Sequence, residues 1–376
     1  MNKIKVAHIL HSVGGVDVHL RLILSALDPN KTSSFIIHGN EDTSIPFHDR
    51  NNVIVKEYKT PIKRNISPYS DFKSFLKVIS ILRKERPDVI HAHSAKGGII
   101  GRAASLFYPI KVLYTPHAFS YLSTSNKIKR KIYLSIERIF KNFNSILLAC
   151  SISEQKRGVE EVGYQNDKTL VFNNSIYPII EVEESIKIKK LPEKYICAVG
   201  RPSYQKNIEM MVNVIKALSI KIPNIHLVIM GVGEYSPNKE KVKKMIKAYG
   251  LDQNITLIPW TSREQIFSIV NKSNLYISTS RYEGLPYSVI EALALSKACV
   301  VTDCDGNVDL VKESYNGYVV KKNEVETMAN RIFVLLTNNK LRKEFETNSY
   351  LFFNENFNIE NNIEKLEKIY LDFHKK

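Results

Sequence analysis

The sequence predicts an α/β protein with two Rossmann-like domains, each built on a doubly wound parallel sheet. Short apolar runs rich in Val and Ile alternate with helical stretches through the first half of the chain. A polar segment interrupts this alternation, which then starts again. The chain has 376 residues, and one domain typically has about 150. Because strands that alternate with helices form parallel sheets, we expect two such domains facing a cleft.

The first domain is expected to span residues 1–175. Residues 1–15 contain a short apolar stretch and no small-residue cleavage site, so we interpret them as a first strand and not as a signal peptide. Apolar runs of four to seven residues predict strands at 4–10, 34–38, 88–92, 111–115, 145–149 and 169–172. The stretches between them predict helices at 15–27, 69–85, 97–107, 127–142 and 153–161.

The second domain is expected to span residues 195–350, after a linker at 176–194 that is polar, charge-dense and contains two prolines. Its apolar runs predict strands at 195–199, 225–230, 255–258, 275–278 and 298–302. Residues 351–376 are expected to form a terminal helix whose apolar face must be buried, by packing back across the domains. Either domain could supply the surface. In sheets of this kind ligands bind beyond the carboxyl ends of the strands, so we expect the chemistry there.

Composition excludes several classes of protein. With 44% hydrophobic and 24% charged residues the chain is globular and not disordered. No apolar run approaches the roughly 18 residues of a membrane-spanning helix. The four cysteines have neither zinc-site nor disulfide-framework spacing, which favours reduced thiols in a cytoplasmic protein. Residues 1–175 hold 26 Lys and Arg against 14 Asp and Glu. This excess of basic residues predicts that the first half binds an anionic partner: nucleic acid, a membrane surface or a phosphorylated substrate.

The densest group of chemically active residues lies at 280–292, after a predicted strand and at the start of a predicted helix. Free N–H groups at a helix N-terminus bind anions, Pro286 suits a first turn, and Gly284 lets the backbone approach a ligand. Glu283 lies in the loop, and Glu291 lies a turn or more into the helix. A phosphate-binding helix end between two carboxylates suits a ligand made of sugar, diphosphate and ribose. Taken alone, the segment is also compatible with a helix cap and an ordinary helical Glu.

A second group, at 199–207, also follows a strand and precedes a helix. Arg201 can form a fork of hydrogen bonds to phosphate oxygens, and Lys206 supplies a mobile positive charge. Two cations suit a diphosphate leaving group, whose charge grows as its bond to the sugar breaks. Both lie in an expected loop, so their loss should affect activity more than folding. Two solvated basic residues in a loop are the alternative.

With these two groups of residues, the sequence resembles the retaining GT-B glycosyltransferases of family 4. The resemblance rests on Glu283 and Glu291, eight positions apart, with Gly200-Arg201 and Lys206-Asn207 some eighty residues earlier. It extends over nearly the whole chain. The other segments that match are Gly14-Gly15 with His19, residues 90–101, Thr115 to Phe119 and Gly231 to Glu234. The paired glutamates are fairly specific, and the whole combination in this order is highly specific.

The resemblance implies a role for each matching residue. Arg201 and Lys206 would bind the diphosphate, and Glu291 would bind the ribose hydroxyls. Glu283 would hold hydroxyls of the transferred sugar as a positioning and electrostatic group, not as a nucleophile. The remaining implied contacts are backbone groups of Gly284, Leu285 and Pro286 at the phosphate, Gly15 at the donor, and His117 at the sugar or acceptor. Family members retain the anomeric configuration, and the usual proposal for them is same-face attack with the donor phosphate accepting the acceptor's proton.

No metal or other cofactor is expected to be required. Asp303-Cys304-Asp305 matches the metal-binding Asp-x-Asp of the other major glycosyltransferase fold. We interpret the match as accidental, because Arg201 and Lys206 would neutralise the diphosphate in place of a metal ion. Asp305 also replaces a glycine common in the family, which puts the backbone path of this loop in doubt. His91 and His93 share one face of a strand and could be metal ligands. With no third ligand of obvious spacing, buried or capping histidines are the favoured interpretation.

The leading functional hypothesis is a retaining glycosyltransferase that uses a UDP-hexose or UDP-N-acetylhexosamine. Residues 93–98 and 114–121 resemble enzymes that build bacterial surface polysaccharides, such as capsule and O-antigen, and lipid-linked oligosaccharides. We therefore expect a lipid-linked or glycan acceptor and a location on the inner face of the cell membrane. The basic amphipathic stretch at 127–143 is equally compatible with a membrane-surface helix and with a helix packed on the sheet.

Two alternatives of other classes remain. A UDP-N-acetylglucosamine 2-epimerase shares the two-domain architecture but needs no acceptor; it would scramble a donor supplied alone, whereas a transferase would at most release UDP slowly. A nucleic-acid-binding protein rests only on the positive charge and predicts retention on heparin with a steep dependence on salt. The paired glutamates have no role in nucleic-acid binding, so we expect no such partner.

Overall fold

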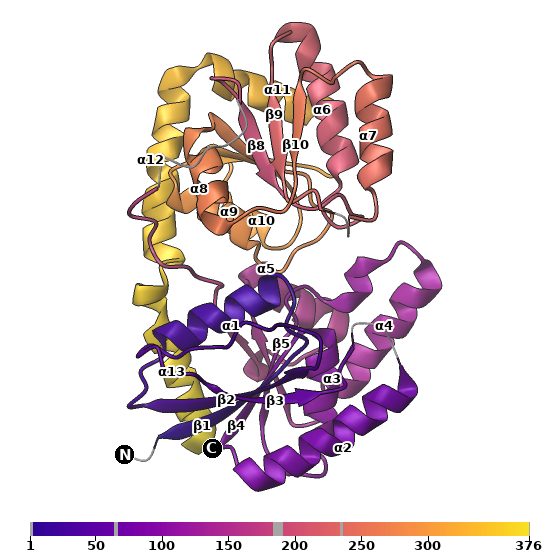
Figure 1. Ribbon diagram of the computed structural model, residues 1–376, viewed down its shortest axis with the longest axis vertical. Coiled ribbons are helices and arrows are strands. Elements are labelled where there is room, and N and C mark those ends of the chain that lie inside the picture. Colours follow the sequence, from indigo (N-terminus) through magenta and orange to yellow (C-terminus); the bar gives the residue numbers. More distant parts are fainter. Residues whose placement is uncertain (1–2, 64–66, 183–190, 234–235, 376) are drawn as a thin grey trace. The chain divides into compact units, whose positions relative to one another are not determined.

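The computed structural model describes residues 3–63, 67–182, 191–233 and 236–375. These form two compact units (Figure 1). Unit 1 contains residues 1–175 and 358–376, and unit 2 contains residues 176–357. The expected terminal segment 351–376 is therefore divided, because one helix ends at Asn356 and a new one begins at Ile359. Part of the expected linker, residues 183–190, lies outside the described residues, as does Glu234 of the Gly231–Glu234 segment.

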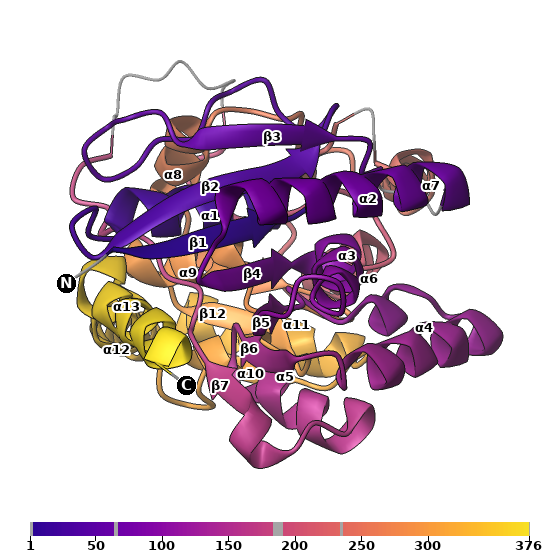
Figure 2. The same cartoon turned by 90° about the horizontal axis from the view of Figure 1, so that it is seen from below.

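Unit 1 is built on a parallel sheet of seven strands in the order β3-β2-β1-β4-β5-β6-β7, which can be followed across Figure 2. The strands are β1 (Ile4–Ile9), β2 (Thr32–Gly39), β3 (Lys56–Thr60), β4 (Val89–His93), β5 (Val112–Thr115), β6 (Ser145–Ala149) and β7 (Thr169–Val171). Its α-helices are α1 (Gly15–Ala26), α2 (Pro68–Glu85), α3 (Ser94–Ala104), α4 (Lys127–Phe140), α5 (Ile152–Arg157) and α13 (Ile359–Lys375). The sequence missed β3, an edge strand whose residues are mostly polar and only partly buried.

Unit 2 is built on a parallel sheet of six strands in the order β10-β9-β8-β11-β12-β13. The strands are β8 (Ile196–Val199), β9 (Leu227–Met230), β10 (Ile255–Ile258), β11 (Leu275–Ser278), β12 (Cys299–Thr302) and β13 (Gly317–Val320), the last of which the sequence missed. The helices are α6 (Ile208–Lys221), α7 (Lys239–Ala248), α8 (Arg263–Lys272), α9 (Tyr287–Ala294), α10 (Asn307–Leu310), α11 (Val325–Thr337) and α12 (Asn339–Asn356).

The terminal helix α13 completes the core of unit 1. Its apolar face joins the buried cluster formed by α1 and the sheet, through Ile359, Ile363, Leu366, Tyr370 and Phe373. Glu367 accepts a hydrogen bond from the backbone N–H of Asp28 (2.8 Å) and pairs with Lys31 (2.7 Å). The surface that the sequence left undecided is therefore supplied by unit 1.

In each sheet the order of the strands reverses between two neighbours, β1 and β4 in unit 1 and β8 and β11 in unit 2. The loops that leave these strands diverge to opposite faces of the sheet, which opens a crevice at their carboxyl ends. Gly15 follows β1 and the predicted site residues of unit 2 follow β8 and β11, whereas His117 follows β5. The prediction of two Rossmann-like parallel-sheet units is confirmed.

Candidate functional site

The loops that follow β8 and β11 in unit 2 are joined by hydrogen bonds. The Thr279 hydroxyl donates towards the backbone carbonyls of Lys206 (3.0 Å) and Asn207 (2.9 Å). The N–H of Arg281 donates to the carbonyl of Gln205 at 2.8 Å. Asn207 has a φ of 51°, in the left-handed region, and ends this loop as the N-cap of α6. The two motifs recognised separately in the sequence, 199–207 and 280–292, are therefore joined in one hydrogen-bonded group of loops.

Glu283 lies at the centre of these joined loops. Its Oε1 pairs with the Lys206 ammonium at 2.6 Å and accepts a hydrogen bond from the Ser280 hydroxyl at 2.7 Å. Its Oε2 accepts a hydrogen bond from the Gln205 side-chain amide at 2.9 Å. The Glu283 side chain is only 7% exposed. A carboxylate held by three donors is fixed in position and does not require a counterion from solution.

The segment after Glu283 leads into the N-terminus of α9. Pro286 is the N-cap of this helix and not part of its first turn, a correction to the sequence-based expectation. Gly306 lies against the backbone here, and a Cβ on it would stand 2.4 Å from the carbonyl oxygen of Gly284. With its φ of 76°, Gly306 allows the loop after β12 to pack on this turn. Asp305 at the preceding position does not prevent that close packing.

Glu291 lies in the second turn of α9, 8% exposed. Arg263, at the start of α8, pairs with its Oε1 at 2.7 Å. Burial raises the pKa of the Glu291 carboxyl, and the Arg263 guanidinium opposes that rise. The sequence did not identify Arg263, because its spacing of 28 positions from Glu291 has no local signature. Only the approach of α8 to α9 brings the two together.

Arg201 follows β8 directly after Gly200 and its side chain is exposed, whereas Lys206 is partly buried in the ion pair with Glu283. Unit 2 thus contains Arg201, Lys206, Glu283 and Glu291 in the loops and helix that follow its switch point. Asp303, from the Asp-x-Asp match, is exposed and accepts a hydrogen bond from the N–H of Lys322 at 2.9 Å.

In unit 1 the first loop leads from β1 into α1, which begins at Gly15. Gly14 has φ 62° and ψ −130°, a conformation that residues with a side chain avoid. Asp42 holds this loop by accepting a hydrogen bond from the N–H of Ser12 and pairing with His11. Burial alone would raise the pKa of Asp42, but its bonds to His11, Ser12 and Gly39 lower it.

His117 lies in the loop after β5, and it and Ala118 both have positive φ angles, 53° and 76°. Such conformations are strained for these residue types, so other contacts must maintain them. Glu154 of α5, which is buried, supplies them: its two oxygens accept hydrogen bonds from the N–H groups of Ala118 (2.7 Å) and Cys150 (2.8 Å). No pattern in the sequence distinguishes Glu154 from any other acidic residue in a predicted helix.

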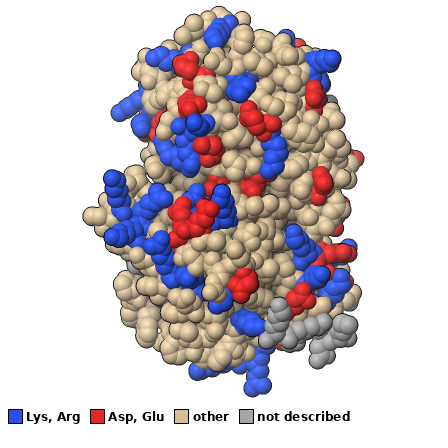
Figure 3. Space-filling model, turned by 180° about the vertical axis from the view of Figure 1, so that it is seen from behind, with Lys and Arg blue, Asp and Glu red and all other residues tan. Residues whose placement is uncertain are grey.

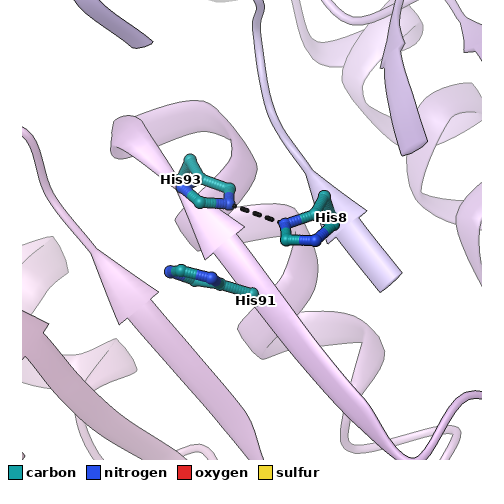
Figure 4. Close-up of side chains that lie close together, drawn as sticks. All are labelled: His8, His91 and His93. Atoms are coloured by element: carbon teal, nitrogen blue, oxygen red, sulfur yellow. Dashed lines mark hydrogen bonds between the residues drawn. The ribbon is translucent and has the colours of Figure 1, made fainter. Parts of the chain in front are cut away.

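The side chain of His117 joins a group of histidines at the carboxyl ends of β1, β4 and β5. The backbone register places His8 of β1 opposite His91 of β4, and His93 opposite Thr115 of β5. His8 Nδ1 and His93 Nε2 are hydrogen-bonded at 3.1 Å; Figure 4 draws this bond as a dashed line. His93 Nδ1 and His117 Nε2 lie 3.4 Å apart. His91 and His93 are buried, and the additional histidines come from strands and loops distant in sequence.

Two family models match the chain. The model described as "Glycosyltransferase Family 4" matches residues 13–178, and the model described as "Glycosyl transferases group 1" matches residues 180–352. The chain is 28% identical to an Escherichia coli enzyme named UDP-Gal:alpha-D-GlcNAc-diphosphoundecaprenol alpha-1,3-galactosyltransferase, over 99% of this chain and 97% of that protein. It is 26% identical to the Staphylococcus aureus capsular polysaccharide biosynthesis glycosyltransferase CapM, covering 83% of this chain and 84% of that one.

Solved structures show the same fold. Sucrose-phosphate synthase from Thermosynechococcus elongatus superposes with a TM-score of 0.84 over 98% of this chain and 99% of its own, at 17% identity. Anabaena HepE in complex with UDP-glucose superposes with a TM-score of 0.77, covering 98% of this chain and 99% of that one, also at 17% identity. From the two family models, which between them extend from residue 13 to residue 352, and from these shared folds, we conclude that the chain belongs to the family 4 glycosyltransferases of the GT-B fold.

Proposed function

We propose that this protein transfers a sugar from a UDP-sugar, with retention of the anomeric configuration, onto a lipid-linked acceptor in the assembly of a bacterial surface glycan. The observation that carries the proposal is the group formed by Lys206, Glu283 and the N-terminus of α9, with Glu291 one turn further on. The choice of donor and acceptor is supported by the names of relatives, one of which uses UDP-galactose and a diphosphoundecaprenol-linked sugar.

Each residue of the candidate site has a proposed role that follows from the chemistry of its side chain. Arg201 and Lys206 would stabilise the charge that develops on the departing diphosphate, together with the backbone N–H groups at the start of α9. Glu291, whose carboxylate is oriented by Arg263, would accept hydrogen bonds from the ribose hydroxyls. Glu283 would bind hydroxyls of the sugar, with its orientation fixed by Ser280 and Gln205. Because charge is neutralised by side chains and amides, no divalent metal is required for transfer.

Retention is proposed without a covalent intermediate. Glu283 already pairs with Lys206 and accepts two further hydrogen bonds, which stabilise its negative charge and make it a poor nucleophile. A carboxylate has about four lone pairs, so it can still accept a hydrogen bond from the sugar. The acceptor hydroxyl would attack from the same face as the departing diphosphate, and a phosphate oxygen would take its proton. His117 would contact the sugar or the acceptor, held in place by Glu154 through the backbone of Ala118.

We also propose that unit 1 docks on anionic lipid through α4, which places the protein on the inner face of the membrane. The inner side of α4 packs on unit 1: Glu137 is buried and pairs with Arg102 at 3.0 Å. Its outer side exposes Ile128 (73%), Ile132 (51%) and Ile139 (55%). Exposed bases lie beside them, and Figure 3 shows Lys and Arg gathered on the projecting edge of unit 1 that carries α4. Among the described residues, no helix is long and apolar enough to cross a membrane.

A donor panel tests the reaction. UDP-, GDP- and ADP-sugars are compared by thermal shift and by slow hydrolysis, and the preferred donor is then offered with a diphosphate-lipid acceptor. We expect UDP-sugars to give the largest shift and an α-linked product from an α-linked donor. A donor whose sugar is epimerised without any acceptor, followed by NMR, would instead support a UDP-N-acetylglucosamine 2-epimerase.

A further inference from the structure

The histidines of unit 1 include residues placed so that they could hold a metal ion. Two groups of three, among the described residues, have ligand nitrogens that all lie within 4.8 Å of one another: His8 with His91 and His93, and His19 with His93 and His117. His93 is common to both groups. Sequence spacing could not reveal either, because the members come from β1, α1, β4 and the loop after β5.

The first group is poorly suited to take up an ion. All three of its members are buried. The two ring nitrogens of His91 are both hydrogen-bonded, Nδ1 to the Tyr370 hydroxyl at 2.8 Å and Nε2 to the Thr115 hydroxyl at 2.9 Å. An ion at this position would have to break one of these buried bonds and would have no exposed ligand through which to enter.

The second group has both an entrance and a suitable geometry. His117 is only partly buried, so one side of the group can be reached from solvent. His93 Nδ1 and His117 Nε2 lie 3.4 Å apart in a long hydrogen bond, which an ion bound by both nitrogens would replace. Two imidazole nitrogens on one tetrahedral zinc ion, each about 2.0–2.1 Å from it, are about 3.3 Å apart. The ring of His19 completes the group, with its centroid 4.7 Å from that of His117 and 5.6 Å from that of His93.

We propose that His19, His93 and His117 form a binding site for a divalent transition-metal ion of the zinc class. Three imidazoles and an open fourth position are the donor set of many zinc sites, and imidazole also suits Co²⁺, Ni²⁺ and Cu²⁺. Mg²⁺ and Ca²⁺ prefer oxygen ligands, which this group lacks.

The surroundings hold the three rings in place. Through its other nitrogen, Nε2, His93 is hydrogen-bonded to His8 Nδ1 (Figure 4). His8 Nε2 in turn lies 3.3 Å from the Ser34 hydroxyl. Glu154 fixes the backbone immediately after His117. Partners of this kind orient metal-binding histidines and typically change metal affinity 10–100-fold when they are removed. His8 is therefore a positioning residue for the site.

The site has a consequence for catalysis, which rests on the proposed function. We propose that His117 contacts the sugar or the acceptor, so a metal ion bound to His117 would compete with that substrate for the same side chain. Zinc would then act as an inhibitor, and transfer would proceed in its absence. This agrees with a diphosphate that is neutralised by Arg201 and Lys206 and not by a metal.

Cobalt titration of the EDTA-treated full-length protein, with any purification tag removed, tests the site directly. We expect one equivalent of Co²⁺ to give the strong visible absorption of a four- or five-coordinate ion, displaced by Zn²⁺ and not by Mg²⁺. His117→Asn, which suits the positive φ but is too short to bind, and His19→Gln should each weaken binding at least tenfold. His48→Ala, outside the cluster, should bind as the unaltered protein does.

Two results would overturn the proposal. One is the absence of this absorption in a protein whose melting curve is normal. The other is a loss of binding in His91→Gln but not in His117→Asn, which would place the ion in the first group. Inhibition of transfer by Zn²⁺ is measured separately. If Co²⁺ binds while no sugar is transferred under any condition, the metal site stands and the proposed reaction fails.

Discussion

Replacing Lys206 by Ala should lower both the turnover number and the free energy of unfolding. The position of Lys206 in a loop, taken alone, predicts little effect on the free energy of unfolding. The Glu283 side chain, 7% exposed, would lose its cation. Removing one partner of a buried ion pair costs about 3–5 kcal/mol. Two hydrogen bonds, from Ser280 and Gln205, would remain, and Lys206 is itself 22% exposed. We therefore expect a loss closer to that of one charged hydrogen bond, about 1.5–3 kcal/mol.

In a domain of this size, each kcal/mol shifts the melting temperature by about 2–4 °C, so unit 2 should melt about 3–12 °C lower. Turnover should fall about 10²–10³-fold if the ammonium stabilises the departing diphosphate. The assays are calorimetry and initial rates at saturating donor. Lys221→Ala is the control, because this exposed lysine of unit 2 donates to Asn330 and lies over the Phe333 ring, away from the residues of the candidate site.

A double variant separates the two effects. Adding Glu283→Gln to Lys206→Ala removes the buried charge and should recover part of the lost stability but none of the activity. Arg201→Ala should reduce transfer by a similar factor with a smaller change in melting temperature, since its side chain is exposed. A Lys206→Ala protein with unchanged melting temperature and turnover within threefold of the original would refute the reasoning.

The remaining predictions concern the nucleotide, the metal and the membrane. Glu291→Ala should raise the KM for donor and the Kd for UDP, whereas Glu283→Gln should mainly lower kcat; calorimetry that finds UDP binding unchanged in Glu291→Ala would exclude the ribose assignment. Because burial raises the pKa of Glu291, UDP affinity should fall on acidification at a pH above that expected for an ordinary carboxyl, and Glu291→Gln should lose this dependence. EDTA should leave transfer intact, and complete loss restored by Mn²⁺ or Mg²⁺ would contradict the proposed role of Arg201 and Lys206. The protein should sediment with anionic vesicles, and high salt or reversal of Lys129, Arg130 and Lys131 to Glu should abolish this binding. The reason is that each basic residue contributes about 1 kcal/mol to the free energy of binding to an anionic surface. Equal binding to neutral vesicles would exclude this docking surface.

The sequence by itself determined the fold class, because strands buried on both faces are continuous apolar runs and the helices between them have their own period. It also located the segments at 199–207 and 280–292, since a ligand-binding loop after a strand depends on residues adjacent in the chain. It missed β3, whose polar edge sequence Lys56–Thr60 has no such pattern. The apolar face of α13 was evident, but its partner was not, because a hydrophobic stripe is complementary to any apolar surface of suitable shape.

Only the tertiary structure decided which distant residues meet. Lys206 and Glu283 are 77 positions apart and form one ion pair because β8 and β11 are neighbours in the sheet. Arg263 reaches Glu291 through the packing of α8 against α9, and Glu154 supports the strained backbone after His117. The histidine group depends in the same way on the order β1-β4-β5. These contacts are set by strand order and helix packing, for which no spacing in the sequence carries a signal.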